Sequence, residues 1–142
     1  MTLQKLQNSA VRFIFNLKRR EHIKPYLKKV HFLPVKERID FKIALLTFKA
    51  INHCAPSYLK DLICLKDPNA SYSLRINLDR NILKPIKPLH HFKSTESAFS
   101  IKAPQIWNSL PSYLRNEQCL SKFKSGLKTF MFQKAFKNTV DI

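Results

Sequence analysis

The chain has 142 residues, 44% of them hydrophobic and 11 of them phenylalanine, so it can bury a real core and wholesale disorder is not expected. Its single glycine argues against a β-rich fold with many tight turns and against a glycine loop that cradles phosphate. The net charge of +17 is spread evenly, because residues 1–71 carry 14 Lys or Arg against five acids and residues 72–142 carry 12 against four. A field of this kind attracts phosphate backbones or anionic membranes, and we favour a nucleic acid as the partner.

The first predicted element is an N-terminal helix within residues 1–20. Thr2 can cap it, and its expected apolar stripe contains Leu3, Leu6, Ala10, Phe13, Ile14 and Leu17. Three cations, Lys18, Arg19 and Arg20, end this helix. They either complement the negative helix terminus or bind phosphate, and one arrangement satisfies both roles.

The central helices are predicted over residues 34–63. Pro34 suits the first turn of a helix, and apolar residues at helical spacing follow it on two faces, which is typical of a helix buried on both sides. Pro56 begins a second, shorter helix. We therefore expect Pro34 to about Asn52 to be the central helix of the fold.

Residues 71–97 change character and are predicted to be an extended basic stretch. Alternating apolar and polar residues, followed by several prolines, indicate a β-hairpin-like segment near 72–93. Residues 98–137 then hold a tryptophan motif and a C-terminal helix. In this part Pro104 should start a short helix, Trp107 should be a core anchor rather than a base-stacking platform, and Ser121 should cap the last helix.

These elements predict a mainly α protein with a single helical domain over residues 1–137 and a frayed tail at 138–142. The domain is expected to be small and built around its central buried helix. The residues expected to form its structural core are Pro34, Ile39, Leu46, Trp107, Phe123 and Leu127.

Candidate chemistry is sparse. The nine acids are scattered, so no carboxylate pair is present that could hold two catalytic metals, and no catalytic, cofactor-binding or metal site is expected. His90-His91 and the set of His53, Cys54 and Cys64 have poor spacing for a metal ligand set. The three cysteines indicate reduced thiols in an intracellular protein, nuclear or cytoplasmic and not secreted. No apolar run approaches the ~18 residues of a membrane span.

Two basic segments are candidate nucleic-acid-binding sites, and neither is expected to read base sequence. The favoured one contains Lys18, Arg19, Arg20, Lys24, Lys28 and Lys29, where the arginines can grip phosphate with a planar fork. The alternative is the extended stretch with Lys84 and Lys87. The positive charge is shared almost equally between the halves of the chain, so both stay open.

An ordered set of short motifs spans nearly the whole chain and resembles the C-terminal region of reverse transcriptases from non-LTR retrotransposons, of the jockey-like and chicken-repeat-like kind. The matching residues are Leu6-Gln7-Asn8, His22-Ile23 with Pro25 and Leu27, Leu33-Pro34-Val35, Arg38-Ile39, Phe41-Lys42, Leu45-Leu46, Lys49-Ala50, Asn52, Ala55-Pro56, Tyr58-Leu59, Asp61-Leu62, Ala98-Phe99-Ser100, Ala103-Pro104, Trp107-Asn108, Leu110-Pro111, Ser121, Phe123-Lys124 and Leu127-Lys128.

In that family the polymerase palm and its catalytic carboxylates lie upstream of this region. The resemblance therefore implies a non-catalytic piece of an RNA-directed DNA polymerase that helps to hold template or target nucleic acid. Two alternatives stay open. The chain is either a structural module that packs on the polymerase body, or a non-functional remnant of a transposable element.

Overall fold

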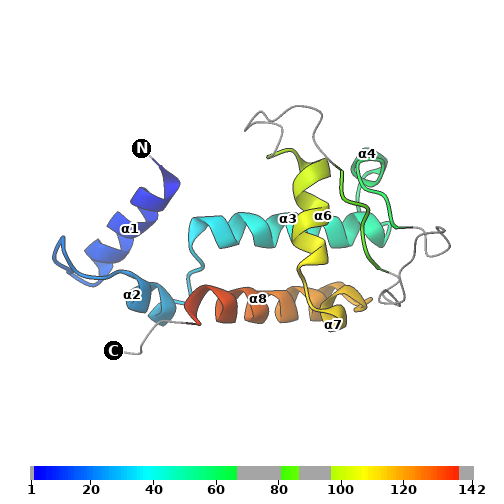
Figure 1. Cartoon of the computed structure of the whole chain (residues 1–142). Coiled ribbons are helices and arrows are strands. Elements are labelled where there is room, and N and C mark those ends of the chain that lie inside the picture. Colours follow the sequence, from blue (N-terminus) through cyan, green and yellow to red (C-terminus); the bar gives the residue numbers. More distant parts are fainter. Residues whose placement is uncertain (1, 67–80, 87–96, 138–142) are drawn as a thin grey trace. The chain divides into compact units, whose positions relative to one another are not determined.

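The computed structural model describes residues 2–66, 81–86 and 97–137 (Figure 1). This part of the chain is mainly helical, with 62% of it in seven helices, as the sequence predicts. The helices are α1 (Leu3–Ile14), α2 (Lys24–Lys29), α3 (Val35–Ile51), α4 (Ser57–Lys60), α6 (Phe99–Asn108), α7 (Ser112–Arg115) and α8 (Leu120–Phe136). None of the helices within these residues is long and apolar enough to cross a membrane.

The expected β-hairpin is not supported. Within the described ranges there is no strand, and extended pairing is limited to one isolated antiparallel bridge between Leu65 and Leu83. Two backbone hydrogen bonds hold this bridge, from Lys66 N–H to the Ile82 carbonyl and from Lys84 N–H to the Cys64 carbonyl, both 2.8 Å. Most of the predicted hairpin, including residues 72–80 and 87–93, lies outside the described residues.

The chain packs as two compact units, one formed by Met1–Phe41 with Ser125–Ile142 and the other by Lys42–Lys124. We call them the terminal unit and the central unit. The backbones of α3 and α8 each run from one unit into the other. The prediction of a single domain over residues 1–137 stays a prediction.

The core of the terminal unit contains Val11, Leu27 and Phe136, all of them buried. Aromatic side chains pack around this core, because the rings of Phe15 and Tyr26 lie 5.1 Å apart and those of Phe132 and Phe136 lie 4.7 Å apart. The core thus joins α1, α2 and the end of α8.

Helix α1 turns its polar side toward the segment that leads into α3, which contradicts the prediction that its apolar stripe faces inward. Gln4 Oε1 accepts the N–H of Val35 at 2.9 Å, and the Gln7 amide donates to the Leu33 carbonyl at 2.9 Å. These bonds set the rotation of the helix about its axis, and the expected stripe is consequently exposed. The exposed fractions of its large members are 67% for Leu3, 50% for Leu6, 89% for Phe13 and 61% for Ile14.

Helix α3 is not buried on both of the faces that we expected. Ala44, Thr47 and Phe48 are buried at the spacing of one helical face. Ile39 and Leu46, which we expected in the core, lie on a face rotated away from these residues and are 51% and 41% exposed. Pro34 precedes the helix and is half-buried, and its carbonyl accepts the N–H of Arg38 at 3.0 Å.

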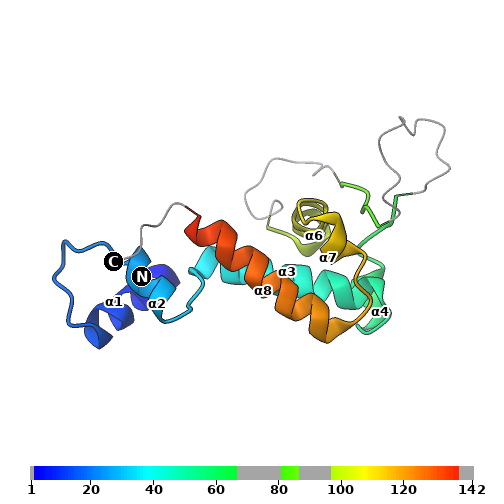
Figure 2. The same cartoon turned by 90° about the horizontal axis from the view of Figure 1, so that it is seen from below.

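The central unit is built around Trp107, which is 1% exposed. Helix α6 crosses the second half of α3 in Figure 1 and is seen nearly end-on in Figure 2. The ring of Phe123, from the start of α8, stacks on Phe48 of α3 at 4.2 Å and lies 5.8 Å from the Trp107 ring. Three helices therefore share one aromatic core. Leu127, which we also expected in the core, belongs to the terminal unit and is fully buried.

Two predicted helix starts are wrong. Pro104 lies inside α6, which begins five residues earlier at Phe99, because buried side chains on both sides of the proline hold the helix together. Helix α8 begins at Leu120, so Ser121 lies inside its first turn. Cys119 occupies the cap position instead, and its carbonyl accepts the N–H of Phe123 at 2.9 Å.

Candidate nucleic-acid interface

The loop between α1 and α2 presents the first three predicted cations. Lys18, Arg19 and Arg20 are all exposed. They do not end a helix, as we expected, because α1 stops at Ile14 and Asn16 takes a left-handed backbone conformation with φ of 49°. The cations therefore lie on a turn, where their charge is not offset by a helix terminus.

Arg12, which is not among the cations predicted from the sequence, holds this loop in place. Its guanidinium donates to the backbone carbonyl of Lys18 and, at 3.0 Å, to that of Glu21. The Glu21 carboxylate in turn accepts the backbone N–H of Lys18 at 2.9 Å. Because these bonds use the backbone of Lys18, its ammonium group is left for other contacts. The sequence signal for this arrangement was weak: an arginine near the end of a helix and the one acid that follows it.

Helix α2 carries the other three predicted cations. Lys24 and Lys29 are exposed, and Lys28 is half-buried. The Lys29 ammonium lies 5.9 Å from the centroid of the Tyr26 ring, within the range of a cation–π contact. Since Tyr26 packs on Phe15 in the core, this contact ties one cation to the rigid part of the unit. The structure thus places all six cations on the loop and the short helix that follows it. We call them the cationic cluster.

A groove of about 380 Å³ lies beside this cluster, within the terminal unit. Six of the nine described residues that line it have polar or charged side chains, with Glu21 the one acid among them, although apolar atoms make up most of the exposed wall. The lining residues are Gln4, Asn8, Arg12, Glu21, His22, Ile23, Lys24, Leu27 and Pro34. The Arg12 guanidinium and the Gln4 amide nitrogen already donate to protein oxygens, so the Lys24 ammonium and the Asn8 amide are the donors that suit phosphate and sugar oxygens here. A sugar-phosphate backbone would therefore meet both charge and donors in the groove.

The electrostatics of this segment are strongly one-sided. From Thr2 to Phe41 the sequence has ten Lys or Arg and three acids, and the carboxylate of one of these acids, Glu21, is engaged by the loop backbone. Cations therefore outnumber acids in this part of the terminal unit. Phosphate groups that approach the cluster meet a net positive charge.

The alternative basic segment lies in the central unit. Lys84 is exposed and follows the bridge residue Leu83, while Lys87 lies outside the described residues. The structure therefore does not place these two lysines together, as it does the six cations of the cluster.

The described residues also offer little for metal chemistry. No group of three or more His, Cys, Asp or Glu side chains among them could hold a metal ion. Cys54, Cys64 and Cys119 are exposed free thiols. The pKa of Cys119 is lowered, mainly by a hydrogen bond to the Ser121 hydroxyl 3.1 Å away.

Comparisons with protein-family models, with curated proteins and with solved structures found no match to this chain. The retrotransposon resemblance therefore stays an expectation from the sequence motifs, and the functions that it implies are proposals.

Proposed function

We propose that this chain binds RNA or single-stranded DNA through the phosphate backbone, with little preference for base sequence. The observation that carries the proposal is the cationic cluster, in which Lys18, Arg19 and Arg20 are exposed on a loop held by Arg12. The sequence motifs support a finer version. In it the chain is a detached, non-catalytic C-terminal region of a non-LTR retrotransposon reverse transcriptase, folded as one small helical domain around α3.

The direct test is the salt dependence of binding. For a single strand the logarithm of the binding constant falls with the logarithm of salt concentration, by about 0.7 per phosphate contact. Arg19→Ala combined with Arg20→Ala should weaken binding of a short RNA and reduce this slope by about 1.4, since two contacts are lost. Lys84→Ala combined with Lys87→Ala removes the same charge and should do less. A larger effect of the second pair would place the binding face in the central unit.

A variant that keeps the net charge separates the effect of loop geometry from the effect of charge. Arg12→Lys keeps the charge but loses the planar fork that reaches two carbonyls, so the loop should loosen and RNA affinity should fall. Lys5→Arg is the matched control, because Lys5 is exposed on the same helix and its side chain has no such bonds to the loop. Equal affinity of Arg12→Lys and the native chain would show that net charge alone drives binding.

The structural-module alternative also has one observation in its favour, the exposed apolar stripe of α1. Its occupant would be the polymerase body of a longer element, with acidic groups facing Lys5 and the cationic cluster. Leu6→Ser with Phe13→Ser should then abolish association with a co-expressed polymerase body and leave RNA binding by the isolated chain intact. If the isolated chain binds no RNA but the pair still associates, the structural reading replaces the first proposal. A chain that does neither is a remnant.

A further inference from the structure

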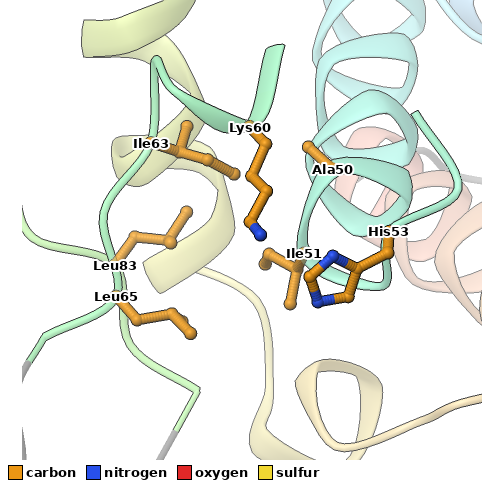
Figure 3. A pocket seen from close by; sticks show the side chains of 7 residues that line it. All are labelled: Ala50, Ile51, His53, Lys60, Ile63, Leu65 and Leu83. Atoms are coloured by element: carbon orange, nitrogen blue, oxygen red, sulfur yellow. The ribbon is translucent and has the colours of Figure 1, made fainter. Parts of the chain in front are cut away.

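The central unit contains a hollow of its own, which none of the residues of the cationic cluster lines. Its volume is about 300 Å³, at the small end of the ~300–1,000 Å³ typical of pockets for small molecules. The end of α3, the turn that follows it, α4 and the two bridged segments form its wall. The lining residues are Ala50, Ile51, His53, Lys60, Ile63, Leu65 and Leu83 (Figure 3).

His53 enters this hollow from an unusual backbone position. The N–H of Cys54 donates to the Lys49 carbonyl at 2.8 Å, which closes the end of α3 with the bond of a Schellman motif. The residue inside that motif adopts a left-handed conformation, and His53 has a φ of 57°. Glycine is the usual residue there because it has no Cβ to strain the backbone. The chain therefore accepts a conformational cost at the position that sends an imidazole into the hollow.

Lys60 comes from α4 and points into the same space. Figure 3 shows its ammonium group pointing toward Ile51 and the His53 ring. Neither side chain has a hydrogen bond or ion pair with any described residue, and no acid is among the lining residues. An ammonium group and an imidazole N–H are thus two donors without an acceptor among the residues that the structure describes.

The rest of the wall is aliphatic. Leu83, Ala50 and Ile63 are buried, and Ile51 and Leu65 complete the lining. Among the described lining residues His53 has the one aromatic ring, and none has an amide or a carboxylate side chain to pair with the polar edge of a base. These walls suit an alkyl group better than a nucleobase.

We propose that this hollow binds a small anionic amphiphile, a carboxylate attached to a short alkyl chain. The carboxylate accepts hydrogen bonds from Lys60 and His53, and the alkyl chain packs on Ile51, Ile63 and Leu65. Charge complementarity selects the head group, and burial of apolar area holds the tail. The site lies in the central unit and does not depend on nucleic-acid binding.

The first test is calorimetric titration of the full chain with octanoate, with octanol and acetate as comparison ligands. Octanoate should bind about tenfold more tightly than octanol, which lacks the charge, and acetate should bind weakly because it lacks the tail. Lys60→Gln should lower octanoate affinity by about tenfold and leave octanol affinity unchanged. Equal affinity for octanoate and octanol, or no effect of Lys60→Gln, would overturn the proposal.

The second test uses the backbone strain at His53. His53→Gly relieves the left-handed conformation and removes the imidazole, so the melting temperature should rise by about 3 °C while octanoate affinity falls several-fold. Asn16→Gly is the matched control, because Asn16 also has a positive φ, of 49°, but lies in the terminal unit away from the hollow. It should raise the melting temperature without changing octanoate affinity. An unchanged affinity in His53→Gly, or an equal loss in Asn16→Gly, contradicts the assignment.

Discussion

Asn108 offers the sharpest test of what holds the central unit together. In the bridge between Leu65 and Leu83, the hydrogen bonds are made by the neighbouring residues, so the N–H and C=O of Leu83 itself point to the other side. There they meet the Asn108 side chain, whose oxygen accepts the Leu83 N–H at 3.0 Å and whose amide donates to the Leu83 carbonyl at 2.9 Å. The Asn108 side-chain amide therefore pairs with the backbone of Leu83 as a neighbouring strand would.

Asn108→Ala should lower the free energy of unfolding by about 2–4 kcal/mol. Leu83 is fully buried, and the substitution leaves both of its backbone polar groups without a partner, at a cost of about 1–3 kcal/mol each. Urea denaturation followed through the fluorescence of Trp107, the only tryptophan, measures this loss. Gln105→Ala is the control, since Gln105 is exposed on the same helix, and it should change stability by less than about 0.5 kcal/mol.

Asn108→Asp sharpens the same test through pH. The ionised carboxylate can accept the Leu83 N–H but cannot donate to the Leu83 carbonyl, whereas the protonated carboxyl can do both. The fold therefore favours the protonated form, so the pKa of the new carboxyl is raised on folding. Its stabilising contribution is present at low pH and is lost as pH rises through the folded pKa. If Asn108→Ala costs less than about 0.5 kcal/mol with an unchanged urea slope, the clamp does not stabilise the fold.

Three further variants test other parts of the fold. Trp107→Ala should cost about 3–5 kcal/mol in urea denaturation, because it empties the aromatic core and frees the Asn81 carbonyl that accepts the indole N–H at 2.8 Å; normal stability with lost RNA binding would make Trp107 a stacking platform instead. The hydrogen bond from Cys119 N–H holds the pKa of Glu117 below its usual value. Glu117 therefore stabilises the fold above its unfolded pKa, and this contribution is lost as pH falls through the folded pKa. Glu117→Gln should make the melting temperature depend less on pH in that acidic window. Gly126→Ala should stabilise α8 by about 0.5–1 kcal/mol in thermal denaturation, and a loss of stability would show that a Cβ does not fit there.

The sequence predicted the helical class because periodic apolar residues and the scarcity of glycine are local signals. It also led us to expect Trp107 in the core, since a lone large aromatic residue in an ordered segment is most often an anchor. The role of Asn108 was not predictable in the same way. Its partner, Leu83, lies 25 residues away, and a side chain that completes a backbone ladder has no periodicity to reveal it.

In the candidate site, too, some features follow from the local sequence and others depend on contacts that the sequence does not reveal. Exposed cations between α1 and α2 follow from the density of Lys and Arg in the sequence, but the loop that carries them does not. It depends on bonds from the Arg12 guanidinium to the Lys18 and Glu21 carbonyls. The hollow beside His53 was missed for a related reason. Only the left-handed backbone and the distant Leu83 bring an imidazole, an ammonium group and aliphatic walls together.

The orientation of α1 shows why hydrophobic patterning alone misplaced a face. Apolar attraction is non-directional, so a helix with Val11 on one side and Leu6 and Phe13 on another could bury either side. Hydrogen bonds are directional, and those of Gln4 and Gln7 to the backbone before α3 are satisfied in one rotation only. Turning the apolar stripe inward would break these bonds and leave the Leu33 carbonyl and the Val35 N–H without these partners. The polar residues therefore decide which side faces the chain, and the exposed stripe follows from that choice.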